Sequence, residues 1–248
     1  IMNNVIFENK SISNTGIDPV NVHDVLRKSM LVDGFDFVLD LQKSHGLRLV
    51  DARTGNEYFD FFSFFASSPI GMNHPKLNTP EFREKLGAAA MNKPSNSDVY
   101  TSEMAGFVDV FSRVAKPDYF KYMFFIDGGA LAVENGLKVA FDWKVRKNFA
   151  KGYKEEKGHQ VIHFKEAFHG RSGYTMSLTN TDPTKILLYP KFNWPRITNP
   201  KIKFPLEKNL DEVIKLEEQA INEIYTAIKN NKDDIALIIL EPVQGEGG

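Results

Sequence analysis

The sequence predicts an α/β domain with a mostly parallel sheet, and a smaller antiparallel unit that precedes it. From residue 101 onward, segments with helical spacing of apolar residues alternate with short strand-like segments. The last of these segments, residues 235–240, is uniformly apolar, as expected of a strand that is covered on both faces. We therefore expect residues 1–65 to belong to the smaller unit and residues 66–248 to form the first part of the larger domain.

The smaller unit is predicted from short alternating segments and the turns between them. Asp18 and Pro19 favour the start of a short helix that continues to Leu26. Apolar and polar residues then alternate in three segments separated by glycine-containing turns, over residues 35–41, 47–51 and 58–62. Three short strands joined by tight turns form an antiparallel meander.

The larger domain is predicted from helices that alternate with strands. Helical spacing of apolar residues predicts helices over residues 80–90, 104–114, 130–147 and 210–228. Strands are predicted over residues 120–126, 160–164 and 235–240. Because strands linked through helices run parallel in one sheet, we expect a parallel sheet with helices on both faces.

The composition of the 248 residues narrows the class of protein. A formal net charge of -1 gives no reason to expect a nucleic-acid partner. Cysteine is absent, which excludes a disulfide framework and a thiolate zinc site and agrees with a reducing cytoplasm. No apolar run reaches the length of a membrane span. We expect a cytoplasmic globular protein that binds neither membranes nor metal ions.

A strand that runs into two glycines and then a helix marks the first candidate site. Gly128 and Gly129 follow Asp127, and the predicted helix begins at Ala130. Glycines allow close approach of the backbone, and the amides at a helix N-terminus attract an anion such as phosphate. The alternative is an ordinary tight turn between a strand and a helix. Neither a dinucleotide fingerprint nor a P-loop pattern is present, which disfavours a nucleotide ligand.

The second candidate site runs from Phe168 to Arg171, after the strand predicted to end at Phe164. In open α/β sheets, ligands bind beyond the carboxyl ends of the strands. There Phe168 offers a flat ring to a planar cofactor, and Arg171 offers a two-bonded donor to a carboxylate. The alternative is a core phenylalanine and a surface arginine. His163 and His169 have no evident third partner for a metal ion, which favours structural histidines.

The third candidate site is the glycine-rich stretch at residues 241–248. Glu241 and Glu246 flank a turn that Pro242 and the glycines make irregular, directly after the predicted apolar strand. A carboxylate at the end of a strand is placed to answer a cationic ligand or a mobile arginine. The alternative is a solvated loop.

In this order and spacing, the three stretches resemble the class III aminotransferases, which bind pyridoxal 5'-phosphate and have the type I fold of enzymes that use this cofactor. The sequence EPVQGEGG at residues 241–248 is similar to a signature of that family. Three further stretches resemble more narrowly its lysine 6-aminotransferase branch, at residues 65–75, 124–144 and 167–181. The resemblance spans essentially the whole chain and implies that it is the N-terminal half of a longer protein.

The resemblance implies roles for individual residues around the cofactor. The amides of Gly129 and Ala130 are expected to hold the cofactor phosphate, and Gly128 is expected to shape the turn that presents them. Phe168 is expected to lie against the pyridine ring, with His169 beside it in the same loop.

The resemblance also implies a substrate site beside the cofactor. Arg171 is expected to bind the α-carboxylate of the amino donor, so that the distal amine reaches the cofactor. Glu246 matches a glutamate that pairs with an arginine, expected beyond Gly248, for one substrate and releases it for the other, and Glu241 supports the site from behind. Phe65 and Ser67 are expected to line the substrate entrance.

The implied activity is transfer of the ε-amino group of L-lysine to 2-oxoglutarate by a homodimer. The lysine that binds the cofactor covalently and the aspartate that keeps its ring nitrogen protonated are expected beyond Gly248. The alternatives are another ω-aminotransferase, acting on ornithine or 4-aminobutyrate, and a non-catalytic homologue that binds a partner. Arg171 favours a donor that keeps an α-carboxylate, which disfavours 4-aminobutyrate more than ornithine.

Overall fold

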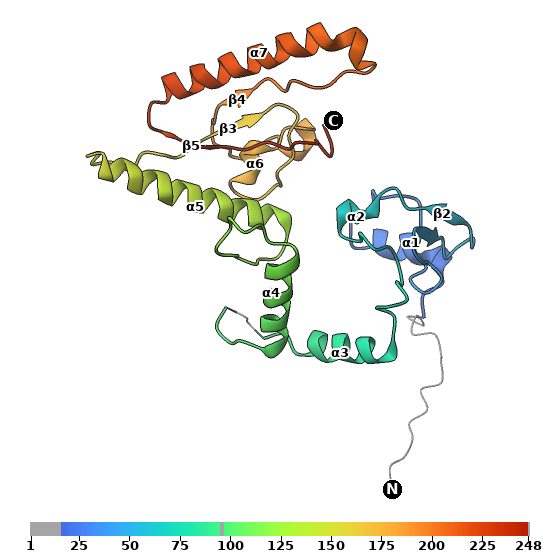
Figure 1. The fold of residues 1–248 in the computed structure, drawn as a ribbon. Coiled ribbons are helices and arrows are strands. Elements are labelled where there is room, and N and C mark those ends of the chain that lie inside the picture. Colours follow the sequence, from blue (N-terminus) through green and yellow to red (C-terminus); the bar gives the residue numbers. More distant parts are fainter. Residues whose placement is uncertain (1–15, 95–96, 248) are drawn as a thin grey trace. The chain divides into compact units, whose positions relative to one another are not determined.

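The computed structural model describes residues 16–94 and 97–247. The chain divides into two compact units, Ile1–Lys116 and Pro117–Gly248 (Figure 1). The predicted division between residues 65 and 66 stays a prediction. Among the described residues, no helix combines the length and the apolarity needed to cross a membrane.

The helices predicted for the first 116 residues are confirmed. The chain forms η1 (Pro19–Asn21), α1 (Val22–Arg27), α3 (Pro80–Met91) and α4 (Ser102–Val114). The hydroxyls of Thr79 and Thr101 accept hydrogen bonds from amides three residues later, at 3.3 and 3.1 Å, and so cap α3 and α4. A further turn, α2 (Ser63–Ala66), was not predicted.

The antiparallel unit contains two strands. β1 (Arg48–Val50) and β2 (Glu57–Phe59) pair antiparallel, with Leu49 opposite Tyr58. β2 ends before the predicted limit because the Asp60 carboxylate accepts hydrogen bonds from the amides two and three residues later, which turns the chain.

The prediction of a third strand over residues 35–41 is wrong. This segment forms a single isolated bridge, between Leu39 and Asp51. Its own side chains compete for the backbone: the Asp40 carboxylate accepts hydrogen bonds from the amides two and three residues later, at 3.0 and 2.9 Å. Such local bonds favour a turn over a ladder.

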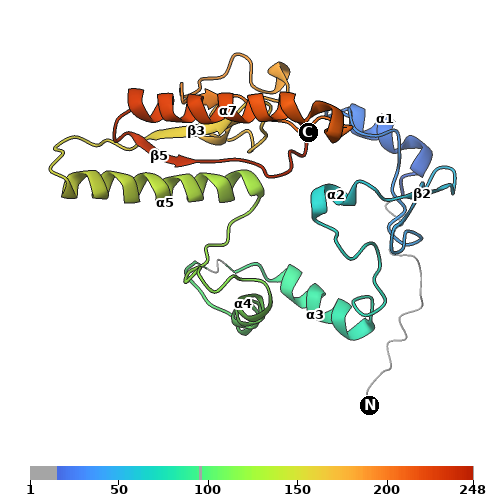
Figure 2. The same ribbon diagram turned by 45° about the horizontal axis from the view of Figure 1, so that its top comes forward.

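The second unit has three layers. β3 (Gln160–Phe164) lies between β4 (Arg196–Ile197) and β5 (Ile235–Ile238), and both neighbours run parallel to it. Figures 1 and 2 show α5 (Gly129–Ala150) on one face of this sheet and α7 (Leu206–Asn230) on the other. The predicted parallel sheet and both of these helices are confirmed.

The alternation of β3 explains why the sheet has a core on each face. Val161 is fully buried in a cluster with Leu137 and Phe141 of α5, whereas the next residue, Ile162, is fully buried against Ala227 of α7. Successive side chains of a strand point to opposite faces, so one strand supplies both cores. Two short elements were not predicted: in the sequence, α6 (Thr175–Leu178) and η2 (Pro183–Lys185) come between β3 and β4.

Two predictions about strands in the second unit need correction. Residues 120–126 form no strand, because no described segment pairs with them, and Tyr122 is 89% exposed. β5 ends at Ile238 and is half-buried, not enclosed on both faces. β5 has a neighbour on one side only within the described sheet, which leaves its apolar side chains partly accessible.

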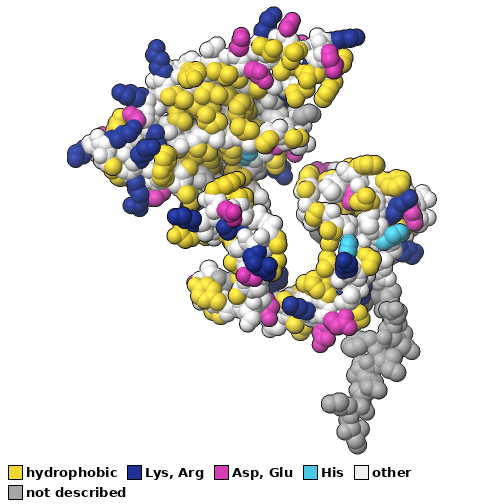
Figure 3. Space-filling view, viewed as in Figure 1, with side chains coloured by type: hydrophobic (Ala, Val, Ile, Leu, Met, Phe, Trp, Pro, Cys, Tyr) yellow, Lys and Arg dark blue, Asp and Glu magenta, His cyan; other side chains and the backbone are white. Residues whose placement is uncertain are grey.

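Apolar side chains gather on the surface of the second unit over the sheet between α5 and α7 (Figure 3). Large apolar residues are exposed on α7 and on residues 235–240, the segment that contains β5. They are Leu210, Ile214, Ile221, Tyr225, Ile228, Ile238 and Leu240. An apolar surface of this kind favours contact with further protein.

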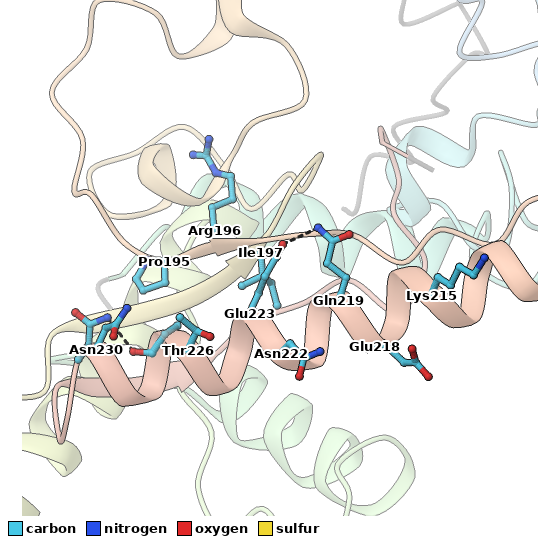
Figure 4. Close-up of a pocket in the computed structure, with 12 residues that line it drawn as sticks. Pro195, Arg196, Ile197, Lys215, Glu218, Gln219, Asn222, Glu223, Thr226 and Asn230 are labelled. Carbon is cyan, nitrogen blue, oxygen red and sulfur yellow. Dashed lines mark hydrogen bonds between the residues drawn. The ribbon is translucent and has the colours of Figure 1, made fainter.

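The edge of the sheet at β4 is closed by side chains of α7. The Glu223 carboxylate accepts hydrogen bonds from the amide and the hydroxyl of Thr198, at 2.5 and 3.0 Å, and from Gln219 at 2.8 Å. Burial raises the pKa of Glu223, but these hydrogen bonds hold it below its usual value. Figure 4 shows Glu223 and Gln219 in a groove of about 700 Å³ between β4 and α7.

A polar cluster joins the end of α5 to the turn before β5. Asn148 is fully buried, and its side-chain amide donates hydrogen bonds to the carbonyls of Lys157 and Asp233, both at 2.7 Å. The Asp233 carboxylate in turn accepts from the Lys151 ammonium at 2.7 Å and the Tyr153 hydroxyl at 2.9 Å. The cluster therefore fixes the position at which the chain enters β5.

Replacing Asp233 by asparagine is expected to remove a pH-dependent part of the stability. The Lys151 ammonium and the Tyr153 hydroxyl lower the pKa of Asp233 to about 2, from about 4 in an unfolded chain. A lowered pKa stabilises the fold above the unfolded value, and this contribution is lost as the pH falls through the folded value. Asparagine also tolerates the left-handed backbone at this position, where φ is 62°.

Urea unfolding from pH 7 down to pH 2 measures this effect. The gap in unfolding free energy between wild type and Asp233→Asn should be present at pH 7 and should close between about pH 4 and 2. Asp211→Asn, an exposed position on α7, controls for the change in net charge. A difference in unfolding free energy that stays constant from pH 7 to pH 2 would contradict the lowered pKa of Asp233.

Candidate functional site

The two glycines before α5 leave the start of that helix open. Gly128 has φ of 87° and ψ of 147°, and its carbonyl accepts the first helical hydrogen bond, from Ala132 at 3.1 Å. No side chain caps the helix, so its first amides are available as donors. Apart from the neighbouring residues of the chain and the backbone of the helix itself, no described atom lies within 4 Å of a Cβ built on Gly128 or Gly129. The turn therefore presents bare amides, and the positive end of a 22-residue helix, to open space.

The loop after β3 packs against this helix start. Gly170 has φ of +117°, and a Cβ built on it would lie 2.5 Å from the Cβ of Ala130. The Thr179 hydroxyl fixes the loop, since it donates to the Gly170 carbonyl at 2.6 Å and accepts from the His169 amide at 3.0 Å. The first and second stretches singled out in the sequence are thus brought together by direct backbone contact.

The third stretch joins them through Glu241. Its carboxylate accepts a hydrogen bond from the Phe168 amide at 2.9 Å, so it holds the backbone that carries the Phe168 ring. Gln244 donates to the Lys165 carbonyl at 3.2 Å, and Gly247 lies so close to Glu166 that a Cβ would meet the Glu166 carbonyl oxygen at 2.1 Å. The last residue of the stretch, Gly248, lies outside the described residues.

Glu246 lies among three cationic or polar groups. Its carboxylate accepts hydrogen bonds from the Lys185 ammonium at 2.5 Å and the Thr181 hydroxyl at 2.8 Å. Lys185, ahead of Thr181 and the more distant charge of Arg171, holds the pKa of Glu246 below its usual value. Arg171 is exposed, and within the described chain its guanidinium forms no ion pair.

Lys185 also lies near the aromatic ring of the site. Its ammonium is 5.4 Å from the centroid of the Phe168 ring, within the range of a cation–π interaction. Lys185 and Thr181 were missed in the sequence because they lie in and next to the short turn η2, where no periodic pattern or glycine pair marks them. Only their contacts with Glu246 identify them.

The two histidines near the site are buried, and burial lowers the pKa of both. The pKa of His163 falls to about 4, mainly through burial, with smaller effects of Arg196 and His169. Burial also lowers the pKa of His169, against an opposing effect of Glu241. Among the described residues no three potential ligands gather around a metal position. Burial therefore disfavours the charged form of both rings, and His169 contributes its amide to the loop.

Phe65 and Ser67 belong to the first unit. Phe65 is 84% exposed and lies in α2, where four successive residues have φ between 47° and 61°. The Ser67 hydroxyl donates to the Phe64 carbonyl at 2.7 Å. Non-glycine residues in this left-handed conformation are strained. The assignment of Phe65 and Ser67 to a substrate entrance stays a prediction.

Comparison with known proteins agrees with this geometry. The family model described as "Aminotransferase class-III" matches residues 32–248. The chain belongs to the class III aminotransferases. Within the family, it is similar to the L-lysine-epsilon aminotransferases of Mycobacterium tuberculosis, with 53% identity over 93% of the chain, and of Amycolatopsis lactamdurans, with 49% identity over 94%.

A solved structure is similar to most of this chain. The lysine aminotransferase of Mycobacterium tuberculosis matches with a TM-score of 0.88 and 52% identity, over 94% of this chain and 53% of that one. The two sequence matches cover 51% of the L-lysine-epsilon aminotransferase of M. tuberculosis and 52% of that of A. lactamdurans. The chain therefore spans about half the length of the relatives that it matches.

Proposed function

We propose that the whole protein containing these residues is a pyridoxal-phosphate-dependent L-lysine 6-aminotransferase. It transfers the ε-amino group of L-lysine to 2-oxoglutarate and forms 2-aminoadipate 6-semialdehyde and L-glutamate. The observation that supports this most strongly is the 53% identity to an L-lysine-epsilon aminotransferase, in a chain whose three candidate stretches contact one another through Gly170 with Ala130 and Phe168 with Glu241.

The residues present fit pyridoxal phosphate. The uncapped amides of Gly129 and Ala130 suit its phosphate, because a helix N-terminus without a side-chain cap offers several donors and a positive potential. The open space beside the two glycines leaves room for that group. When bound, the cofactor supplies an electron sink for the charge left as a proton leaves the carbon that carries the amine.

The remaining residues of the site bind and orient. Glu241 holds the backbone of Phe168 through its amide, and the Phe168 ring would then lie against the pyridine of the bound cofactor. Arg171, which has no ion-pair partner in the described chain, is available for the α-carboxylate of lysine or a carboxylate of 2-oxoglutarate. We further propose that the protein works as a homodimer in the cytoplasm, which agrees with the absence of cysteine from the sequence.

Coupled assays of the complete protein with L-lysine, L-ornithine and 4-aminobutyrate test the proposal. With 2-oxoglutarate as acceptor, kcat/KM should be highest for L-lysine. A clear preference for ornithine would replace the lysine assignment by another ω-aminotransferase activity. No glutamate formation from any of the three donors, in protein that contains bound cofactor, would favour a non-catalytic homologue.

Replacing Arg171 by alanine is expected to raise KM for both L-lysine and 2-oxoglutarate by about tenfold. A hydrogen bond to a charged group contributes about 1.5–3 kcal/mol to binding when it is buried and less when it is exposed, and about 1.4 kcal/mol corresponds to a factor of ten. Initial rates over a range of each substrate measure this effect, and Arg171→Lys should recover only part of it because lysine lacks the planar fork. Unchanged KM values would remove Arg171 from the substrate site.

A further inference from the structure

The short segment that carries Arg171 is held against α5 on both sides of that residue. Before it, Gly170 packs on Ala130, where an added Cβ would lie 2.5 Å from the Ala130 Cβ. After it, the Tyr174 amide donates a hydrogen bond to Oε1 of Glu134 at 2.9 Å. Ala130 and Glu134 are four residues apart and therefore lie on the same face of the helix. One face of α5 thus contacts the chain just before and just after Arg171.

Bonds within the segment add to this hold. The Thr175 hydroxyl accepts a hydrogen bond from the Ser172 amide at 3.0 Å and lies 2.9 Å from the Ser172 hydroxyl. The Tyr174 ring packs edge-on against Phe141 of α5, with 5.7 Å between the ring centroids. The backbone from residue 170 to residue 175 is therefore fixed relative to α5, although the side chain of Arg171 is exposed.

Glu134 is directed to the loop and not to a cation. Its side chain belongs to a half-buried residue, and an added Cβ on Gly173 would lie 3.4 Å from the same carboxylate oxygen that accepts the Tyr174 amide. α5 forms an ion pair through Asp142 and Arg146, and no ion pair among the described residues involves Glu134. A hydrogen bond from an amide to a carboxylate is stronger than one between neutral groups, so Glu134 is well suited to hold this backbone.

The same helix carries the amides that we propose bind the cofactor phosphate. Ala130 supplies one of them, and Glu134 lies one turn further along α5. α5 therefore sets the spacing between the cofactor and the segment of Arg171. An amino donor whose carboxylate binds Arg171 must span that spacing to bring its distal amine to the cofactor, and rates depend strongly on such positioning. L-Lysine and L-ornithine differ in this span by one methylene group.

We propose that Glu134 is a positioning residue that contributes to the choice of amino donor: by holding the Tyr174 amide it fixes the distance from Arg171 to the cofactor, and so selects donors by length. This inference rests on the proposed function, because it takes Arg171 as the carboxylate clamp. It assigns Glu134 no direct contact with the substrate or the cofactor.

The ratio of kcat/KM for L-lysine to kcat/KM for L-ornithine, measured on the complete holoenzyme, tests this role. Glu134→Met keeps the length of the side chain and its helix propensity but removes the acceptor for the Tyr174 amide. One methylene group is discriminated by about 10-fold to 200-fold in a fitted site. Because the Gly170 contact remains, only part of this should be lost, and we expect the ratio to fall by about fivefold.

Conservative and matched variants separate positioning from general damage. Glu134→Gln keeps an acceptor oxygen at the same place and should hold the ratio within about twofold of wild type. Asp142→Met removes an acidic side chain from the same helix, one that pairs with Arg146, and should leave the ratio unchanged. Affinity for pyridoxal phosphate should stay within about twofold in Glu134→Met, because the amides of Gly129 and Ala130 are retained.

The outcomes distinguish this inference from the proposed function. An unchanged ratio in Glu134→Met, an equal fall for both donors, or the same loss in Glu134→Gln would overturn the role of Glu134 even in an enzyme that prefers lysine. If Glu134→Met does not fold, Glu134→Asp replaces it: the shorter carboxylate should lower the ratio too, and an unchanged ratio would again overturn the role. A wild type that prefers ornithine would overturn the lysine assignment alone, and Glu134→Met should then shift its ratio toward equality from the other side.

Discussion

Valine in place of Gly129 is expected to weaken the binding of pyridoxal phosphate to the complete protein by about 100-fold or more. Hydrogen bonds to a charged group contribute about 1.5–3 kcal/mol each, and the branched side chain would block the approach of the phosphate to at least two amides. The effect is expected mainly on binding, because outside its own helix and its chain neighbours no described atom lies within 4 Å of the new Cβ.

Titration of the apo-protein with pyridoxal phosphate, followed by absorbance, measures the dissociation constant. Gly136→Val is a matched control, because Gly136 lies in the same helix, is exposed and also has open space around its Cβ position. That variant carries the same helix-propensity cost but should bind the cofactor normally. Retention of the cofactor by Gly129→Val would show that the phosphate binds elsewhere.

Alanine in place of Gly170 is expected to destabilise the protein by about 3 kcal/mol and to disrupt the site. Two causes act together. The φ of +117° is a conformation that only glycine adopts without strain, and the new Cβ would lie 2.5 Å from Ala130 Cβ and 2.9 Å from the Thr175 hydroxyl. Because Ala130 belongs to the first turn of α5, relief of this clash would move the amides that we propose bind the phosphate.

Denaturant unfolding and cofactor titration together measure the effect of Gly170→Ala. Gly173→Ala is the control in the same loop: its nearest neighbour is the Glu134 carboxylate at 3.4 Å, and its backbone is not left-handed. We expect a small change in stability at Gly173 and a large one at Gly170. Similar unfolding free energies for the two variants would mean that the loop does not pack tightly on α5.

Local patterns in the sequence predicted the elements that depend on local interactions. α5 and α7 have apolar stripes and were found within a few residues of their ends, and β3 was found at its observed bounds. Residues 35–41 alternate and residues 120–126 are mostly apolar, but a strand exists only where a second strand accepts its hydrogen bonds. The alternating pattern contains no information about that partner.

The candidate site likewise contains residues that local sequence patterns identified and residues that only the structure identified. Gly128, Phe168 and Glu241 stand out because glycine pairs and aromatic or acidic residues after strands are unusual in sequence. The bonds of Lys185 and Thr181 to Glu246 span 61 and 65 residues of the chain, and nothing in either segment alone predicts them. The packing of Gly170 on Ala130 likewise depends on how β3 and α5 are arranged, and not on either local sequence.

The closure of β4 by Glu223 has a consequence for how this sheet accepts new strands. With the Thr198 amide already occupied, a strand added along β4 would have to displace a partly buried carboxylate from its donors. β5 presents no such barrier in the described sheet, because its other side pairs with no described strand. Within the described sheet, β5 is therefore the edge at which an added strand would meet no such side-chain barrier.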